Sequence, residues 1–157
     1  MATPDFILEL REMIGNHPLW LPGVTALVTD DRGRLLMGQR SDNGRWALPS
    51  GIAEPGEEMA MACAREVLEE TGIEIEVQQL ISISTIPPTT YLNGDVSSYV
   101  DHFFRCRAVA GTAQVGDDES LAVGWFDPDD LPEPSTPRTA ELLAVAAKQA
   151  VTGLAVF

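Results

Sequence analysis

Basic residues are scarce in this chain of 157 residues, which carries 10 Lys and Arg against 24 Asp and Glu, for a net charge of −14. Such a charge repels phosphate polymers and anionic bilayers, so it argues against a nucleic-acid polymer or a membrane surface as partner. No apolar stretch is long enough to span a bilayer, because Lys148 and Gln149 interrupt the apolar C-terminal segment. The composition therefore excludes two large classes of partner.

Cysteine is also rare, and nothing at the start of the chain resembles a secretion signal. Cys63 and Cys106 have no metal-binding spacing, and Cys63 has apolar neighbours, so we expect buried free thiols. The first residues contain early acids and no apolar core, unlike a signal peptide. We therefore expect a cytoplasmic protein, for which a homodimer is one arrangement that the sequence leaves open.

The remaining composition is that of a folded protein, with 45% hydrophobic and 22% charged residues. We expect residues 1–157 to form a single domain, because this length is ordinary for one hydrophobic core. Periodicity and turn residues predict helices over 4–14, 58–71 and 137–150, and strands or extended segments over 23–30, 34–40, 46–52, 73–85, 99–110 and 122–127. Two prolines and Asn93-Gly94 predict a loop over 86–98, and a second loop is expected over 111–120. This order predicts an α+β fold with a mixed β-sheet sandwiched between helices.

The most informative segment runs from Gly51 to Ile73, where a turn rich in Gly and Pro leads into an acidic helix. Residues three and four apart share a helix face, so Glu66 stands beside both Glu69 and Glu70. Each close pair repels by about 4 kcal/mol at ~4 Å and an effective dielectric of ~20. A cation relieves this repulsion, and several carboxylate oxygens on one face suit Mg²⁺ or Mn²⁺. A solvated acidic face is the alternative explanation for the acidic run alone.

The same residues resemble the complete Nudix box. Gly51, Glu57 and the run from Arg65 to Ile73 fill every defined position of that motif. The resemblance extends from about residue 23 to about residue 132, and it implies the Nudix fold. It also implies hydrolysis of a nucleoside diphosphate linked to another group. One departure is Ser50, where the family often has a second Gly, but serine keeps the backbone carbonyl that the family uses as a metal ligand.

The box residues have expected roles. Glu66 and Glu70 are the first candidates for metal ligands, because four residues are close to one helical turn. Glu69 is either a third ligand or the residue that polarises the attacking water. Arg65 keeps its charge and is a counter-ion for the cluster, and the resemblance implies that Glu57 orients it, with plain helix capping as the alternative. Gly51 is expected to permit a tight backbone conformation.

Outside the box, the loop acid Glu119 is a further candidate, because many relatives carry a metal ligand or general base in this loop. Four other side chains are candidates for contacts with substrate: Arg40 and Arg45 with phosphate, and Trp46 and Tyr91 with a base. Packing in the core or at the rim is the alternative for both aromatic residues. The candidate catalytic set is therefore Arg65, Glu69, Glu70 and Glu119.

The expected function is metal-dependent hydrolysis of a phosphoanhydride bond by attack of water on phosphorus, with Mg²⁺ or Mn²⁺ as cofactor. The substrate is a small nucleotide such as ADP-ribose, a dinucleoside polyphosphate or a nucleoside triphosphate. Two loose family markers disagree about which one, because Pro87-Pro88 is typical of ADP-ribose hydrolases and Tyr91 of dinucleoside polyphosphate hydrolases. The alternative function is a non-catalytic, nucleotide-sensing module, although such a chain is expected to have lost a box carboxylate.

Overall fold

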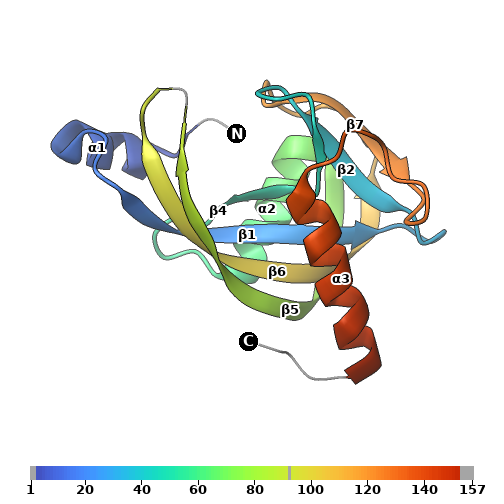
Figure 1. Cartoon of the computed structure of the whole chain (residues 1–157). Coiled ribbons are helices and arrows are strands. Elements are labelled where there is room, and N and C mark those ends of the chain that lie inside the picture. Colours follow the sequence, from blue (N-terminus) through green and yellow to red (C-terminus); the bar gives the residue numbers. More distant parts are fainter. Residues whose placement is uncertain (1–2, 92, 153–157) are drawn as a thin grey trace.

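Strand β1 lies at the centre of a mixed β-sheet (Figure 1). The structure is a computed structural model, which describes residues 3–91 and 93–152. The elements follow one another as α1 (Asp5–Ile14), β1 (Leu19–Thr29), β2 (Leu35–Arg40), β3 (Trp46–Ala47), β4 (Ser50–Ile52), α2 (Met59–Thr71), β5 (Ile73–Thr90), β6 (Val96–Gly111), β7 (Ser120–Phe126) and α3 (Pro137–Thr152). No helix within the described ranges is both long and apolar enough to cross a membrane.

The sheet combines parallel and antiparallel pairs in the order β3-β2-β1-β6-β5, with β4 also pairing with β1 and β7 with β2. β1 and β6 run parallel over their whole shared length, from Leu19 opposite Ser97 to Thr29 opposite Arg107. β1 and β2 are in register only at Thr29 and Leu35. The group β2, β3 and β7 therefore diverges from the rest of the sheet, as Figure 1 shows.

Two helices cover opposite faces of this sheet, with α3 in front and α2 behind in the view of Figure 1. Alternate residues of β1 point to opposite faces, so Val28 packs in one core cluster with Val67 of α2. Its neighbour Leu27 packs in a second cluster with Leu142 of α3. The predicted α+β architecture, a mixed sheet sandwiched between helices, is confirmed.

The predicted loop over 86–98 is wrong, because β5 continues to Thr90 and β6 begins at Val96. Among the described strands, β5 pairs only with β6 and is therefore an edge strand. An edge strand tolerates proline, because the N–H groups on its free side form no hydrogen bonds to a neighbouring strand. The register shifts between Ile86 and Thr89, where Pro87-Pro88 lies, so the ladder resumes after the prolines. The result is a long β5–β6 hairpin that projects beyond the sheet (Figure 1).

Candidate functional site

Glu66 of α2 presses against Gly51 of β4. Gly51 lies opposite Val24 in the antiparallel pair of β4 with β1, and a Cβ at position 51 would overlap the Glu66 carboxyl group. The Glu66 side chain is completely buried. Its Oε1 accepts hydrogen bonds from the Ile52 N–H at 3.2 Å and from Arg65 Nη1 at 2.9 Å. The missing side chain at Gly51 is thus what brings this carboxylate to the strand.

The second oxygen of Glu66 is left without a donor. Oε2 is buried, and no described residue offers it a hydrogen bond. Burial raises the pKa of Glu66 to about 7, although the charge of Arg65 acts in the opposite direction. A buried polar atom of this kind normally has a partner, and a cation supplies one. Glu66 therefore fits the ligand role that its spacing predicts.

Arg65 connects the helix to the turn that precedes it. Its guanidinium binds both oxygens of Glu57, with Nε to Oε1 at 2.9 Å and Nη2 to Oε2 at 2.8 Å. It also donates to the Ile52 carbonyl at 3.1 Å and to Glu69 at 3.2 Å. The hydrogen bonds to Glu57 raise the pKa of Arg65 and, reciprocally, Arg65 lowers the pKa of Glu57. This paired geometry is what an orienting role for Glu57 requires.

Glu70, one helical turn after Glu66, also contacts β4: its Oε2 accepts a hydrogen bond from the Ser50 N–H at 3.3 Å. Burial, followed by the charge of Glu66, raises the pKa of Glu70 to about 8. Glu69, by contrast, has a half-exposed side chain. Within residues 3–91 and 93–152, no three His, Cys, Asp or Glu side chains are grouped as a metal site requires. The fit to a hard cation thus rests on two shielded carboxylates beside one strand.

The loop before β7 docks onto the end of α2. The Gln114 N–H donates to the Thr71 carbonyl at 3.0 Å, and the Gly116 N–H to the Glu70 carbonyl at 3.1 Å. A Cβ at position 116 would overlap the backbone of Glu69, so the contact is tight. It brings Asp117 near enough for its charge to raise the pKa of Glu70. Sequence reasoning missed Asp117, because nothing in the run Asp117-Asp118-Glu119 marks which acid faces the helix.

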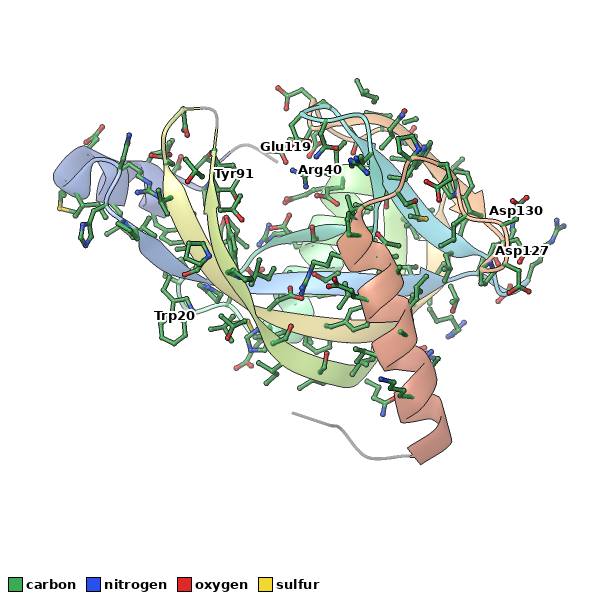
Figure 2. All side chains as sticks on the ribbon, viewed as in Figure 1. Trp20, Arg40, Tyr91, Glu119, Asp127 and Asp130 are labelled. Atoms are coloured by element: carbon green, nitrogen blue, oxygen red, sulfur yellow. The ribbon has the colours of Figure 1, made fainter. Side chains whose placement is uncertain are left out.

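Arg40 at the end of β2, Glu119 in the loop before β7 and Tyr91 in the turn after β5 lie in the same part of the molecule (Figure 2). Arg40 binds both oxygens of Asp42, at 2.9 and 2.7 Å, and these hydrogen bonds raise its pKa, with smaller contributions from Glu119 and Tyr91. The Glu119 carbonyl accepts from the Ser41 N–H at 2.7 Å, which fixes this loop beside Arg40. The β5–β6 hairpin carries Tyr91 to the same place.

Arg45 lies next to Arg40, whose N–H donates to the Arg45 carbonyl at 2.9 Å, but the side chains of Arg45 and Trp46 have other partners. Arg45 Nη1 donates to the Ser135 carbonyl at 3.2 Å. The ring of Trp46 meets that of Phe126 edge to face, with centroids 4.8 Å apart, beside the core cluster under α3. Both residues therefore contact the segment before α3 or its core, and the structure does not group them with Tyr91.

A hollow of about 470 Å³ lies at a different place, lined by Asp30, Asp31, Ile73, residues 108–113 and Trp125. It contains none of the box carboxylates. Asp30 is bound there by Arg34, whose Nε lies 2.8 Å from the Asp30 Oδ2. The hollow is therefore separate from the candidate site around Glu66.

Comparison with known proteins places these residues in a family. The NUDIX domain model matches residues 19–146. A MutT-like protein of Streptomyces ambofaciens is 38% identical over 138 residues, which cover 88% of this chain and 81% of the relative. The human 8-oxo-dGDP phosphatase NUDT18 is 33% identical over 117 residues, or 71% of this chain, and the match spans only 33% of that longer protein. The crystal structure of an ADP-ribose pyrophosphatase from Streptococcus suis superposes with a TM-score of 0.63 and 26% identity, over 83% of this chain and 91% of that one.

Proposed function

Because the chain belongs to the NUDIX domain family of pyrophosphohydrolases, we propose that it cleaves the pyrophosphate bond of a nucleoside diphosphate derivative with Mg²⁺ or Mn²⁺. Nudix hydrolases generally need divalent metal ions. The observation that carries the proposal is the buried Glu66 carboxylate, which has an oxygen without a donor and is fixed between Gly51 and Arg65. A merely structural glutamate at this place would leave a buried polar atom uncompensated.

Glu66, Glu70 and the backbone carbonyl of Ser50 are the groups that would hold the ion, with Glu69 as a further ligand. An ion held by these groups would supply charge neutralisation for the pyrophosphate and would lower the pKa of the attacking water. Carboxylate and carbonyl oxygens are the donors that hard divalent cations prefer. The chain therefore offers the correct donor type where α2 meets the β4 strand.

The protein's own side chains orient the metal-binding carboxylate and accept the proton of the attacking water. Arg65 holds the Glu66 carboxylate in place and balances part of its charge, while Glu57 keeps the guanidinium from turning. A carboxylate, either Glu69 or the loop acid Glu119, accepts the proton of the water that attacks phosphorus. Arg40 lies opposite Tyr91 and is suited to bind a substrate phosphate. No covalent intermediate is needed, because water displaces the leaving phosphate directly.

The names of two similar proteins support a substrate class. The names 8-oxo-dGDP phosphatase and ADP-ribose pyrophosphatase both describe compounds that contain a nucleoside diphosphate unit. We propose this unit as the recognised part, with dinucleoside polyphosphates and nucleoside triphosphates as the remaining alternatives. A single domain over residues 1–157, a cytoplasmic location and a homodimer stay predictions.

Hydrolysis assays test the proposal. The protein is incubated with ADP-ribose, oxidised and ordinary guanine nucleotides, diadenosine polyphosphates and nucleotide sugars, each with Mg²⁺, Mn²⁺ or excess chelator. We expect turnover only with metal, and a loss of several orders of magnitude in Glu70→Gln but not in Glu76→Gln, which changes an exposed carboxylate. Reaction in ¹⁸O-labelled water should place the label on a phosphate product.

Three results would contradict this function. Full activity in chelator excludes the metal-dependent reaction, and label on the sugar carbon means that a glycosidic bond is cleaved. Tight nucleotide binding without turnover on any substrate supports a sensing module instead.

A further inference from the structure

Arg11, in the last turn of α1, is a central contact between that helix and the β5–β6 hairpin. Its Nη1 donates to the carbonyls of Gly15 at 3.0 Å and His17 at 2.7 Å. Its Nη2 donates to the Val96 carbonyl at 2.9 Å and to the Ser97 hydroxyl at 3.1 Å. Together these bonds tie the end of the helix to the first residues of β6.

An ion pair adds to these bonds. Arg11 Nε lies 3.3 Å from Asp95 Oδ1, and the two side chains are only 11% and 22% exposed. The Arg107–Glu76 pair, at the other end of the same two strands, is 47% and 55% exposed. Exposed pairs contribute little because water screens them, so the shielded Arg11–Asp95 pair is the stronger restraint on the hairpin.

The turn between β5 and β6 fits closely against the segment after α1. Gly94 has φ of +87°, and a Cβ there would lie 2.7 Å from Asn16 Nδ2. The Tyr91 N–H donates to the Asp95 carbonyl, and the Gly94 N–H donates to the Tyr91 carbonyl, both at 2.9 Å. Asp95, which Arg11 binds, and Tyr91 therefore belong to one hydrogen-bonded turn. Two successive contacts, Arg11 to Asp95 and Asp95 to Tyr91, therefore connect Arg11 to Tyr91.

Tyr91 lies on the side of the hairpin that faces Arg40 and Glu119, away from α1 (Figure 2). Its hydroxyl shares a hydrogen bond of 2.6 Å with the hydroxyl of Tyr99. It also lies close enough to Arg40 to contribute to the raised pKa of that guanidinium, and Figure 2 shows both near Glu119. The placement of the turn thus fixes the separation between Tyr91 on the hairpin and Arg40 on β2.

We propose that Arg11 is a positioning residue for substrate: it holds the β5–β6 turn so that Tyr91 stands opposite Arg40, and the nucleotide binds between these two side chains. Tyr91 contacts the nucleoside and Arg40 a phosphate. This inference rests on the proposed nucleotide hydrolysis. It gives α1 a function in binding, although the helix supplies no group to the chemistry.

Steady-state kinetics of Arg11→Ala and Arg11→Lys test the inference, with Arg107→Ala as the matched control. We expect KM to rise about tenfold in Arg11→Ala, with kcat changed by less than about threefold, because binding is lost and the carboxylates are untouched. Arg11→Lys keeps the charge but not the forked geometry, so KM should rise as well. Arg107→Ala should leave both constants unchanged.

Hydrogen exchange supplies a measurement that needs no substrate. Backbone amides of residues 93–97 should exchange faster in both Arg11 variants than in the parent, whereas amides of α2 keep the parent's rates. Faster exchange throughout the chain would mean general destabilisation and would overturn the assigned role. Unchanged exchange in 93–97 would overturn it too.

A double substitution shows whether Arg11 acts through Tyr91. If it does, Arg11→Ala in a Tyr91→Ala background raises KM much less than in the parent, because coupled residues are not additive. Independent, multiplicative effects on KM would overturn the inference. If the parent hydrolyses no nucleotide, the proposed function fails, while the exchange measurement still decides whether Arg11 restrains the turn.

Discussion

Gly51 and Glu66 are in such close contact that a single methyl group on the glycine would occupy the space of the carboxyl carbon. Gly51 is not among the glycines with positive φ in the described chain, and it lies in the regular strand β4. The reason expected from sequence, a tight backbone conformation, is therefore wrong. The position needs glycine because the Glu66 side chain occupies the place of a Cβ.

Gly51→Ala should displace Glu66. We expect a loss of about 1–3 kcal/mol in the free energy of unfolding, as for other overpacked cores. We also expect a loss of about 100-fold in kcat, because misplacement of reacting groups by about 1 Å costs this much. Thermal unfolding and steady-state assays measure the two effects. Gly23→Ala, on the neighbouring strand β1, is the control for stability, since its Cβ would make ordinary contacts at 3.5 Å.

Arg65→Lys should lower activity by about 10- to 100-fold, the usual effect of removing a group that orients a metal ligand. Lysine cannot bind both oxygens of Glu57 and reach Glu66 and the Ile52 carbonyl at once. Calorimetric titration with Mn²⁺ should show weaker binding as well. Arg107→Lys, which alters an exposed pair with Glu76, should change neither quantity; an equal loss there would refute the orienting role.

Glu119→Gln should reduce kcat by about 100-fold with KM nearly unchanged, if Glu119 is the general base. The structure adds a second explanation for such a loss, because Glu119 lies beside Arg40. Combining Glu119→Gln with Arg40→Ala separates the two. If Glu119 is the general base, the fold-losses in kcat of the two single substitutions should multiply in the double variant. If Glu119 only orients Arg40, Glu119→Gln should cause no further loss in the Arg40→Ala background. Parent-like activity in Glu119→Gln would direct attention to Asp117, which lies near Glu70.

Stability without metal should fall as pH rises. Burial raises the pKa of Glu66 to about 7 and of Glu70 to about 8, from 4.5 in the unfolded chain. The folded protein thus holds protons that the unfolded chain has released, and this stabilisation is complete below about pH 4.5 and lost as pH rises toward 8. Melting temperatures measured in chelator should decline over this window. Glu70→Gln should flatten the decline, and Mg²⁺ should raise the melting temperature most at high pH; a flat parent profile would contradict the prediction.

The box helix shows what sequence is able to predict. A helix expected over 58–71 is observed over Met59–Thr71, and it ends where Gly72 adopts the left-handed conformation with φ of +70°. These features depend on neighbours in the chain. The predicted loop over 86–98 is wrong for the opposite reason, because pairing with β6 extends β5 beyond Pro87-Pro88. Local propensity gives no information about such a partner strand.

The family, the α+β fold and the box carboxylates can be inferred from the amino-acid sequence alone, because the box residues lie within one short segment and their spacing is set by the helix. Three relationships emerge only when the chain is folded: one Glu66 oxygen lacks a donor, Asp117 lies near enough to Glu70 for its charge to raise that pKa, and Glu119 and Tyr91 lie near Arg40. These relationships join β2, the β5–β6 hairpin, α2 and the loop before β7. They depend on strand register and packing between distant segments, which local residue patterns do not encode.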